Sequence, residues 1–253
     1  MAIFNFKSRQ ASTTLPASTE GSEPYQGDLG KTGLLRDLFE CSKAERDQTW
    51  QDQVLEHMAT ASFACANPPV IQGPDGFPYL SLQTPEANKP FQCYVIHRVI
   101  PDFIMERGIG IVINAQKAQP DWVFSYGDLV NYTLNGRFYE PVMGAPLPEK
   151  EQIQKDESVL TGQPSETYLP ASTRSVLRKF IEQQGIQDPK IVLMSRKYDT
   201  EVRQELVCNL TPEKVGTALF ETLHKYIGWF LPRHYSLVAM QENGSLKRDF
   251  KAL

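Results

Sequence analysis

A proline-rich stretch between residues 141 and 170 places the strongest limit on how this chain can fold. It holds five of the chain's eighteen prolines, two glycines and a run of Glu, Gln and Lys residues. Proline removes a backbone donor and fixes φ, and the other residues here include few that could fill a core. We therefore predict a linker over 141–170 that divides the 253 residues into two modules.

Hydrophobic periodicity predicts an α+β fold for the module before this stretch. Apolar residues recur every three or four positions as far as Met58 and alternate from residue 70 onward. We expect a helix capped by Thr32 and a second one opened by a Ser42–Glu45 capping box. The helical region would end at Asn67-Pro68-Pro69. Strands are then predicted at 77–82, 91–96, 109–113 (central in its sheet) and 122–124.

The module after residue 170 has clearer sequence signals for the ends of its helices and strands. Ser172 and Thr211-Pro212 open helices, and the strand patterns lie at 190–195, 205–210 and 235–240. The resulting order is α-β-β-α-β, after which Asn243-Gly244 turns the chain into a polar tail. Residues 1–30 are rich in Ser, Thr, Gly, Pro and Glu and show no apolar period. The predicted organisation is therefore 1–30 flexible leader, 31–140 N-terminal α+β module, 141–170 proline-rich linker and 171–253 C-terminal α+β module.

Composition excludes several classes of protein. A formal net charge of -4, from 30 acidic and 26 basic residues, gives no electrostatic signature of nucleic-acid or membrane binding. The sequence has no run of about 18 apolar residues, which a membrane-spanning helix needs. The first residues carry their charges after the apolar ones, whereas a signal peptide has the reverse order. We expect a cytoplasmic protein. Its cysteines are scattered without a C-x-x-C pair and are expected as small buried hydrophobes: Cys41, Cys65, Cys93 and Cys208.

Two partial motifs favour structural roles over catalysis. Gly27-Asp-Leu-Gly30-Lys31-Thr32 resembles a phosphate-binding loop, but its glycines are too close together and no strand precedes them. Ser125 lies between a strand and a helix, as a hydrolase nucleophile does, yet Val123 replaces the first glycine of G-x-S-x-G. We therefore expect helix starts at both places. The alternative is a hydrolase-like enzyme that uses Ser125 with Asp128 or Asp121 nearby.

The spacing of the histidines does not match a metal-binding motif. H-E-x-x-H is absent, and no two of the four histidines lie three or four residues apart. The sequence thus indicates no catalytic constellation, no metal and no cofactor.

Two clusters combine aromatic and charged residues at junctions between elements. One is 121–128, at a strand–helix junction, and the other is 229–235, between a helix and a strand. Core packing with polar caps would explain both. The alternative is a protein-binding surface, since aromatic residues and Arg dominate binding hot spots. The candidate binding residues are Trp122, Tyr126, Asp128, Trp229, Arg233 and His234.

The two-part layout resembles the bacterial enhanced-serine-sensitivity (SseB-type) family. In the first module the resemblance rests on Leu34-Leu35, on the helix through Trp50–Met58 and on Trp122–Asp128 entering a helix. In the second it rests on the helix 172–184, on Ile191–Met194, on Glu205–Leu210 and on Phe230-Leu-Pro232. It implies a bacterial, cytosolic protein without an established catalytic site, and it transfers no functional residue.

The hypothesis that follows is a non-enzymatic protein, adaptor-like or immunity-like, whose partner is another protein. Besides the hydrolase alternative, a small-ligand sensor with a cleft between its modules stays open.

Overall fold

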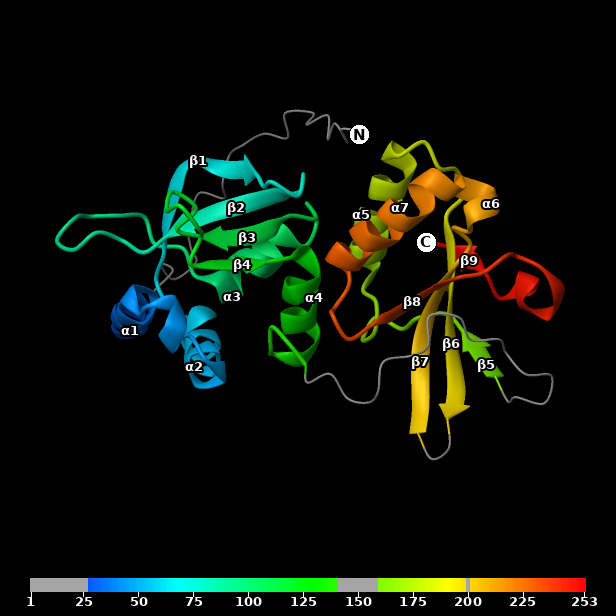
Figure 1. Ribbon diagram of the computed structural model, residues 1–253, viewed down its shortest axis with the longest axis horizontal. Coiled ribbons are helices and arrows are strands. Elements are labelled where there is room, and N and C mark those ends of the chain that lie inside the picture. The colour runs from blue at the N-terminus through cyan, green and yellow to red at the C-terminus, as the bar shows by residue number, and fades with distance from the viewer. Residues whose placement is uncertain (1–26, 141–158, 199–200) are drawn as a thin grey trace, which may run out of the picture. The chain divides into compact units, whose positions relative to one another are not determined.

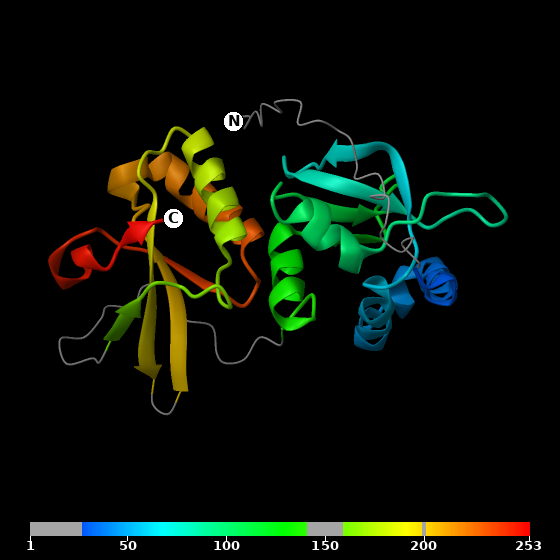
Figure 2. The same ribbon diagram turned by 180° about the vertical axis from the view of Figure 1, so that it is seen from behind.

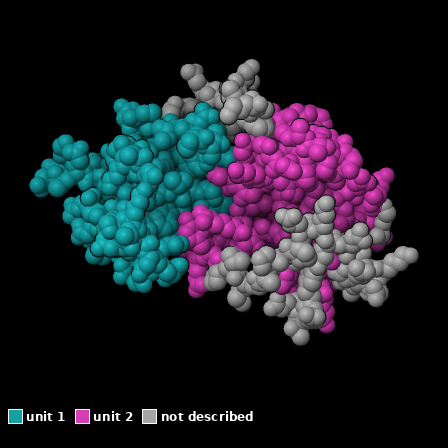
Figure 3. All heavy atoms as spheres, viewed as in Figure 1, with its two compact units in different colours: residues 1–129 teal, residues 130–253 magenta. Residues whose placement is uncertain are grey.

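The computed structural model describes residues 27–140, 159–198 and 201–253 and has an α+β fold, as the sequence predicts (Figure 1). The chain forms two compact units, residues 1–129 and 130–253, which Figure 3 colours separately. Their boundary falls inside α4 (Tyr126–Asn135), ahead of the predicted module end at residue 140.

The helices of unit 1 begin where acidic side chains cap them. The Asp28 carboxylate accepts the Lys31 N–H at 3.0 Å, so α1 (Leu29–Glu40) starts before Thr32, and the prediction that Thr32 is its cap was wrong. The Ser42–Glu45 capping box is present, but it opens only the short η1 (Lys43–Glu45). The following α2 (Gln48–Met58) starts after Asp47. Figure 2 shows α1 and α2 from behind as a neighbouring pair.

A four-stranded sheet of order β1-β2-β3-β4 forms the rest of unit 1 with two short helical turns, α3 (Ile96–Val99) and η2 (Ile100–Ile104). Its strands are β1 (Ala64–Gln72), β2 (Pro78–Gln83), β3 (Gly110–Ile113) and β4 (Trp122–Phe124). The parallel β2–β3 pair and the antiparallel β3–β4 pair make β3 central, which confirms that prediction.

Two further local predictions in unit 1 were wrong. Asn67-Pro68-Pro69 lies inside β1 instead of ending a helix, because an edge strand tolerates residues without a backbone donor. The strand predicted at 91–96 is reduced to a single bridge between Tyr94 and Phe63. Its apolar residues serve the start of α3 instead, where Ile96 is fully buried.

Unit 1 buries one apolar core between its helices and its sheet. A β-carbon on Gly110 would lie 2.5 Å from the Phe124 carbonyl oxygen, so only glycine fits at the start of β3. The fully buried members of this core include Leu35, Val54, Met58, Leu80, Leu82, Ile96, Ile104, Ile111 and Ile113.

Unit 2 is a five-stranded sheet with helices α5 and α7 side by side on one face (Figures 1 and 2). The order is β5-β6-β7-β8, and β9 pairs with β6. Its elements are β5 (Val159–Gly162), α5 (Ala171–Gln183), β6 (Lys190–Tyr198), β7 (Glu201–Cys208), α6 (Pro212–Val215), α7 (Thr217–Phe230), β8 (Ser236–Ala239), η3 (Gly244–Arg248) and β9 (Lys251–Ala252).

The ends of unit 2 are more ordered than the sequence suggested. Residues 141–158 of the predicted linker lie outside the described residues, but β5 pairs with β6 and Leu169 is fully buried. The predicted linker therefore does not extend to residue 170. The predicted polar tail also packs, because Phe250 joins an apolar cluster with Val192, Met194 and Val207 on the face opposite α5 and α7.

Candidate protein-binding surface

Most of the first predicted cluster, 121–128, packs in the core of unit 1. Tyr126 is fully buried and its hydroxyl donates to the Met105 carbonyl at 2.8 Å. Trp122 is half-buried, with its ring 5.7 Å from that of Trp50 and 5.9 Å from that of Phe124. These contacts join β4 and α4 to the rest of the unit.

Ser125 and Asp128 form a reciprocal cap at the start of α4. The Ser125 N–H donates to the Asp128 carboxylate at 2.9 Å, and the Asp128 N–H donates to the Ser125 hydroxyl at 3.1 Å. Asp128 is fully buried. A side chain without accessible surface cannot meet a partner, so assigning Tyr126 and Asp128 to a binding surface was wrong. Both residues hold α4 in place.

The same geometry gives Ser125 no general base. All four histidines lie in the described part of the chain, and none is within hydrogen-bond distance of the Ser125 hydroxyl. Asp121 is occupied elsewhere, since its carboxylate accepts from the Asn114 side chain at 2.7 Å and pairs with Lys117 at 2.8 Å. A serine nucleophile needs a base that takes its proton, and the described contacts of Ser125 supply none.

The second predicted cluster, 229–235, lies where α7 passes into β8, and part of it is exposed. Arg233 and His234 are exposed, whereas Trp229 is half-buried with its ring edge-on to Phe230. The Arg233 guanidinium lies over the ring of Tyr139, 4.2 Å from its centroid. Unit 2 thus presents a cation that an aromatic ring holds in place.

A stack of tyrosines supports this connection from within unit 2. The ring of Tyr235 stacks on that of Tyr168 at 4.3 Å and meets His234 edge-on at 4.8 Å. Tyr235 also donates to the Tyr168 carbonyl. Burial raises the pKa of Tyr235 to about 12 and raises that of Tyr168 as well. Both hydroxyls therefore stay neutral at physiological pH and add no charge to the surface.

β8, which follows this connection, is the last strand of its sheet. Among the described residues only β7 pairs with it. The Met240 N–H donates to the Cys208 carbonyl at 2.9 Å, so alternate residues of β8 face β7. The backbone groups of Leu237 and Ala239 therefore point away from β7. We name Arg233, His234 and the outer edge of β8 the β8 edge surface.

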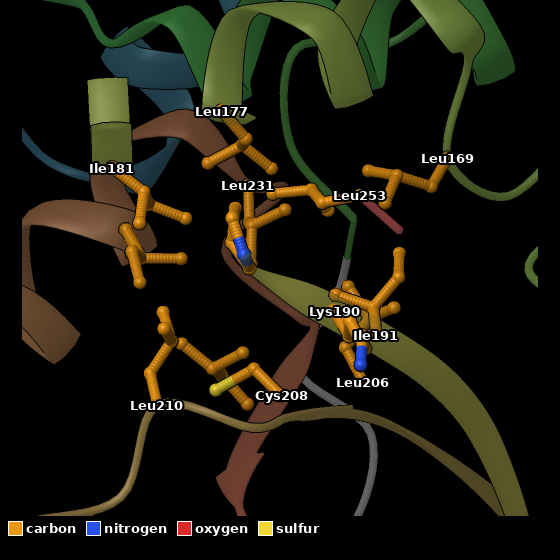
Figure 4. Close-up of a pocket in the computed structure, with 13 residues that line it drawn as sticks. Leu169, Leu177, Ile181, Lys190, Ile191, Leu206, Cys208, Leu210, Leu231 and Leu253 are labelled. Carbon is orange, nitrogen blue, oxygen red and sulfur yellow. The ribbon is translucent and has the colours of Figure 1, made fainter. Parts of the chain in front are cut away.

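A pocket inside unit 2 is lined by apolar side chains of α5, α7 and the sheet (Figure 4). The space there that a water-sized sphere can occupy is only about 20 Å³, room for about one water molecule. Lys190 and Cys208 supply its only ionisable side chains; the other lining residues are Leu169, Leu177, Ile181, Pro189, Ile191, Leu206, Leu210, Ile227, Leu231, Leu237 and Leu253. With so few polar groups, this pocket belongs to the core.

Cys208 in this pocket is not an activated nucleophile. Its sulfur lies 4.0 Å from His224 Nε2, but burial raises the pKa of the thiol to about 11. Burial also lowers the pKa of His224. Both groups are therefore neutral near pH 7, whereas a catalytic pair needs a thiolate and an imidazolium.

The remaining sequence motifs are structural too. The Thr32 hydroxyl donates to Asp28 and accepts the Ser62 N–H at 2.8 Å, while the Lys31 amine donates to Thr60. Both side chains of the motif that resembles a phosphate-binding loop thus tie α1 to the segment before β1. Within the described ranges, no three His, Cys, Asp or Glu side chains are grouped to hold a metal ion. No described helix is both long and apolar enough to cross a membrane.

Sequence reasoning missed the residues that support the β8 edge surface. Tyr139 and Tyr168 lie far along the chain from Arg233 and Tyr235, and no local pattern links them. It also missed an ion pair between Arg196 and Glu205, whose side chains are 5% and 3% exposed and 3.8 Å apart. Only the register of β6 and β7 brings these two charges together.

Comparisons with protein-family models, with curated proteins and with solved structures found no match for this chain. The resemblance to the SseB-type family therefore stays a prediction.

Proposed function

We propose that this chain is a non-enzymatic, adaptor-like or immunity-like protein that binds another protein through the β8 edge surface. The observation that carries the proposal is the exposed Arg233, stacked on Tyr139, at the start of an edge strand. Stacking holds the guanidinium in a defined position before any partner arrives. Less conformational entropy is then lost on binding.

The backbone of β8 provides a second reason. Outward N–H and C=O groups at Leu237 and Ala239 can extend the sheet if a partner supplies an extended segment. All four residues of β8 are only half-buried. Main-chain bonds would give affinity, and Arg233 would favour a partner that carries a carboxylate near the first bonded residue.

The two other hypotheses have less support. The Ser125 hydroxyl caps a helix, and its described contacts include no general base, so a hydrolase function has less support. The pocket described above lies within unit 2 and is apolar, so it adds nothing to a sensor with a cleft between the modules. That sensor hypothesis stays a prediction, which a thermal-shift screen with metabolites tests.

The experiment uses the tagged full chain as bait in a lysate of its native source. Proteins that it retains are identified, purified and titrated against the chain by calorimetry. The test variants are Arg233→Glu, which reverses the exposed charge, and Ala239→Pro, which removes an outward N–H that an edge strand can spare. Arg248→Glu is the matched control, because the Arg248 side chain is 87% exposed and lies in η3.

We expect one stoichiometric partner whose affinity falls at least about tenfold with Arg233→Glu and with Ala239→Pro. Arg248→Glu should leave the affinity unchanged. Circular dichroism of each variant verifies that the fold is intact. If Arg233→Glu and Ala239→Pro bind the partner as tightly as the unmodified chain, the β8 edge surface is not the binding site.

A further inference from the structure

Two Asn-Gly pairs occur in the chain, Asn135-Gly136 and Asn243-Gly244. Such a pair is prone to deamidation, because the glycine amide nitrogen can attack the side-chain carboxamide without hindrance from a β-carbon. Both asparagines are exposed. Exposure therefore does not separate them, and any difference must come from the local backbone.

At Asn135 the attacking group is held in the helix. The Gly136 N–H donates to the Tyr132 carbonyl at 2.8 Å, which closes the last turn of α4. The carboxamide of Asn135 is also engaged, since its Nδ2 donates to Asn131 Oδ1 at 2.8 Å. Attack would require both bonds to break and the helix end to unwind.

Asn243 lies before a helix instead of at the end of one. The residue has an extended backbone, with φ -130 and ψ 170, and its side chain does not cap η3. Gly244 is the first residue of η3, a position whose N–H has no acceptor within its own helix. The one hydrogen bond of the carboxamide, to Gln241, is long at 3.3 Å.

We propose that Asn243 is a site of spontaneous deamidation in the folded protein and that Asn135 is protected. The Gly244 nitrogen loses its proton to water and bonds to Cγ of Asn243, and the carboxamide C–N bond breaks to release ammonia. Water then opens the succinimide ring at either carbonyl. The products are aspartate and isoaspartate, and one amide has been exchanged for one carboxylate.

The new charge would arise beside an existing ionic cluster. The neighbouring Glu242 pairs with the Lys190 amine at 2.9 Å and accepts from Asn209, while Asp188 holds the same lysine at 2.9 Å. These two carboxylates raise the pKa of Lys190 to about 12. Deamidation adds a third carboxylate here, and isoaspartate also lengthens the main chain between β8 and η3.

The test is peptide mapping by mass spectrometry after the purified full chain has been incubated at mildly alkaline pH. We expect the peptide with Asn243 to gain about one dalton and to split into aspartate and isoaspartate forms, while the peptide with Asn135 stays unchanged. In denaturant both peptides should convert. Asn243→Gln serves as the blocked control.

Two results would overturn the proposal. One is that Asn243 stays intact in the folded chain while it converts in denaturant. The other is that Asn135 and Asn243 convert at equal rates in the folded chain, because the local backbone would then give no protection.

Discussion

The junction at 121–128 and the connection at 229–235 have similar compositions, but their charged residues differ in burial. Each combines aromatic and charged residues between a helix and a strand. In the first, Tyr126 and Asp128 are fully buried and satisfy backbone groups. In the second, Arg233 and His234 are exposed. The difference shows that an acid at a helix start has backbone donors to satisfy, whereas a base beyond a helix end can stay at the surface.

Tyr126 gives the largest expected effect, on the buried side of this comparison. Tyr126→Ala should lower the free energy of unfolding by about 3–5 kcal/mol, because it leaves a cavity and removes the donor to Met105. Tyr126→Phe keeps the ring and should cost about 1 kcal/mol. Urea denaturation measures both. A loss below about 0.5 kcal/mol for Tyr126→Ala would show that this junction is not part of the core.

Ser125 tests whether the serine acts as a cap. Ser125→Ala should cost about 1 kcal/mol, since the Asp128 N–H loses its acceptor. Ser125→Thr keeps a hydroxyl and should retain most of this stability. The same denaturation experiment serves here. Equal stability of the alanine variant and the unmodified chain would count against the cap.

Tyr235, in the second region, should make the free energy of unfolding depend on pH. Its pKa is raised to about 12 in the folded chain, against about 10 in an unfolded chain. The folded state therefore holds the proton more tightly, and this contribution is complete below about pH 10 and is lost as the pH rises toward 12. The free energy of unfolding should fall across that window, and less steeply in Tyr235→Phe. Parallel pH profiles for the two proteins would contradict the assignment.

Arg233 should have the smallest effect on stability. Arg233→Ala removes an exposed contact with Tyr139 and should change the free energy of unfolding by no more than about 0.5–1 kcal/mol. A double-mutant cycle with Tyr139→Ala isolates the pair. A loss above about 2 kcal/mol would place Arg233 with the structural residues, as in the first region.

Local sequence signals predicted local structure well in this chain. Ser125 was expected as a cap, β3 as the central strand and Ser42–Glu45 as a capping box, and each depends on residues within a few positions or on a strong apolar run. The predicted Thr32 cap failed locally, because Asp28 caps α1 four residues earlier. Other predictions failed where the structure depends on residues distant in the sequence. Val159–Gly162 becomes a strand because β6 lies beside it. Pro68 is accepted in β1 because that strand is at an edge.

The candidate surface was predictable only in part, for the same reason. The sequence pointed to Trp229, Arg233 and His234 by composition, but composition pointed equally to Tyr126 and Asp128. The two groups differ in how deeply they are buried, and burial depends on the fold of the whole unit. Tyr139, which holds Arg233, follows α4 and lies close to it only in the folded unit.

Amide hydrogen exchange with and without the purified partner tests the central claim most directly, because it reads both regions in one experiment. The account predicts that the partner slows exchange at residues 235–239, with the outward amides of Leu237 and Ala239 most affected, and leaves 121–128 unchanged. Protection confined to 121–128, or binding without any protection along β8, would contradict it.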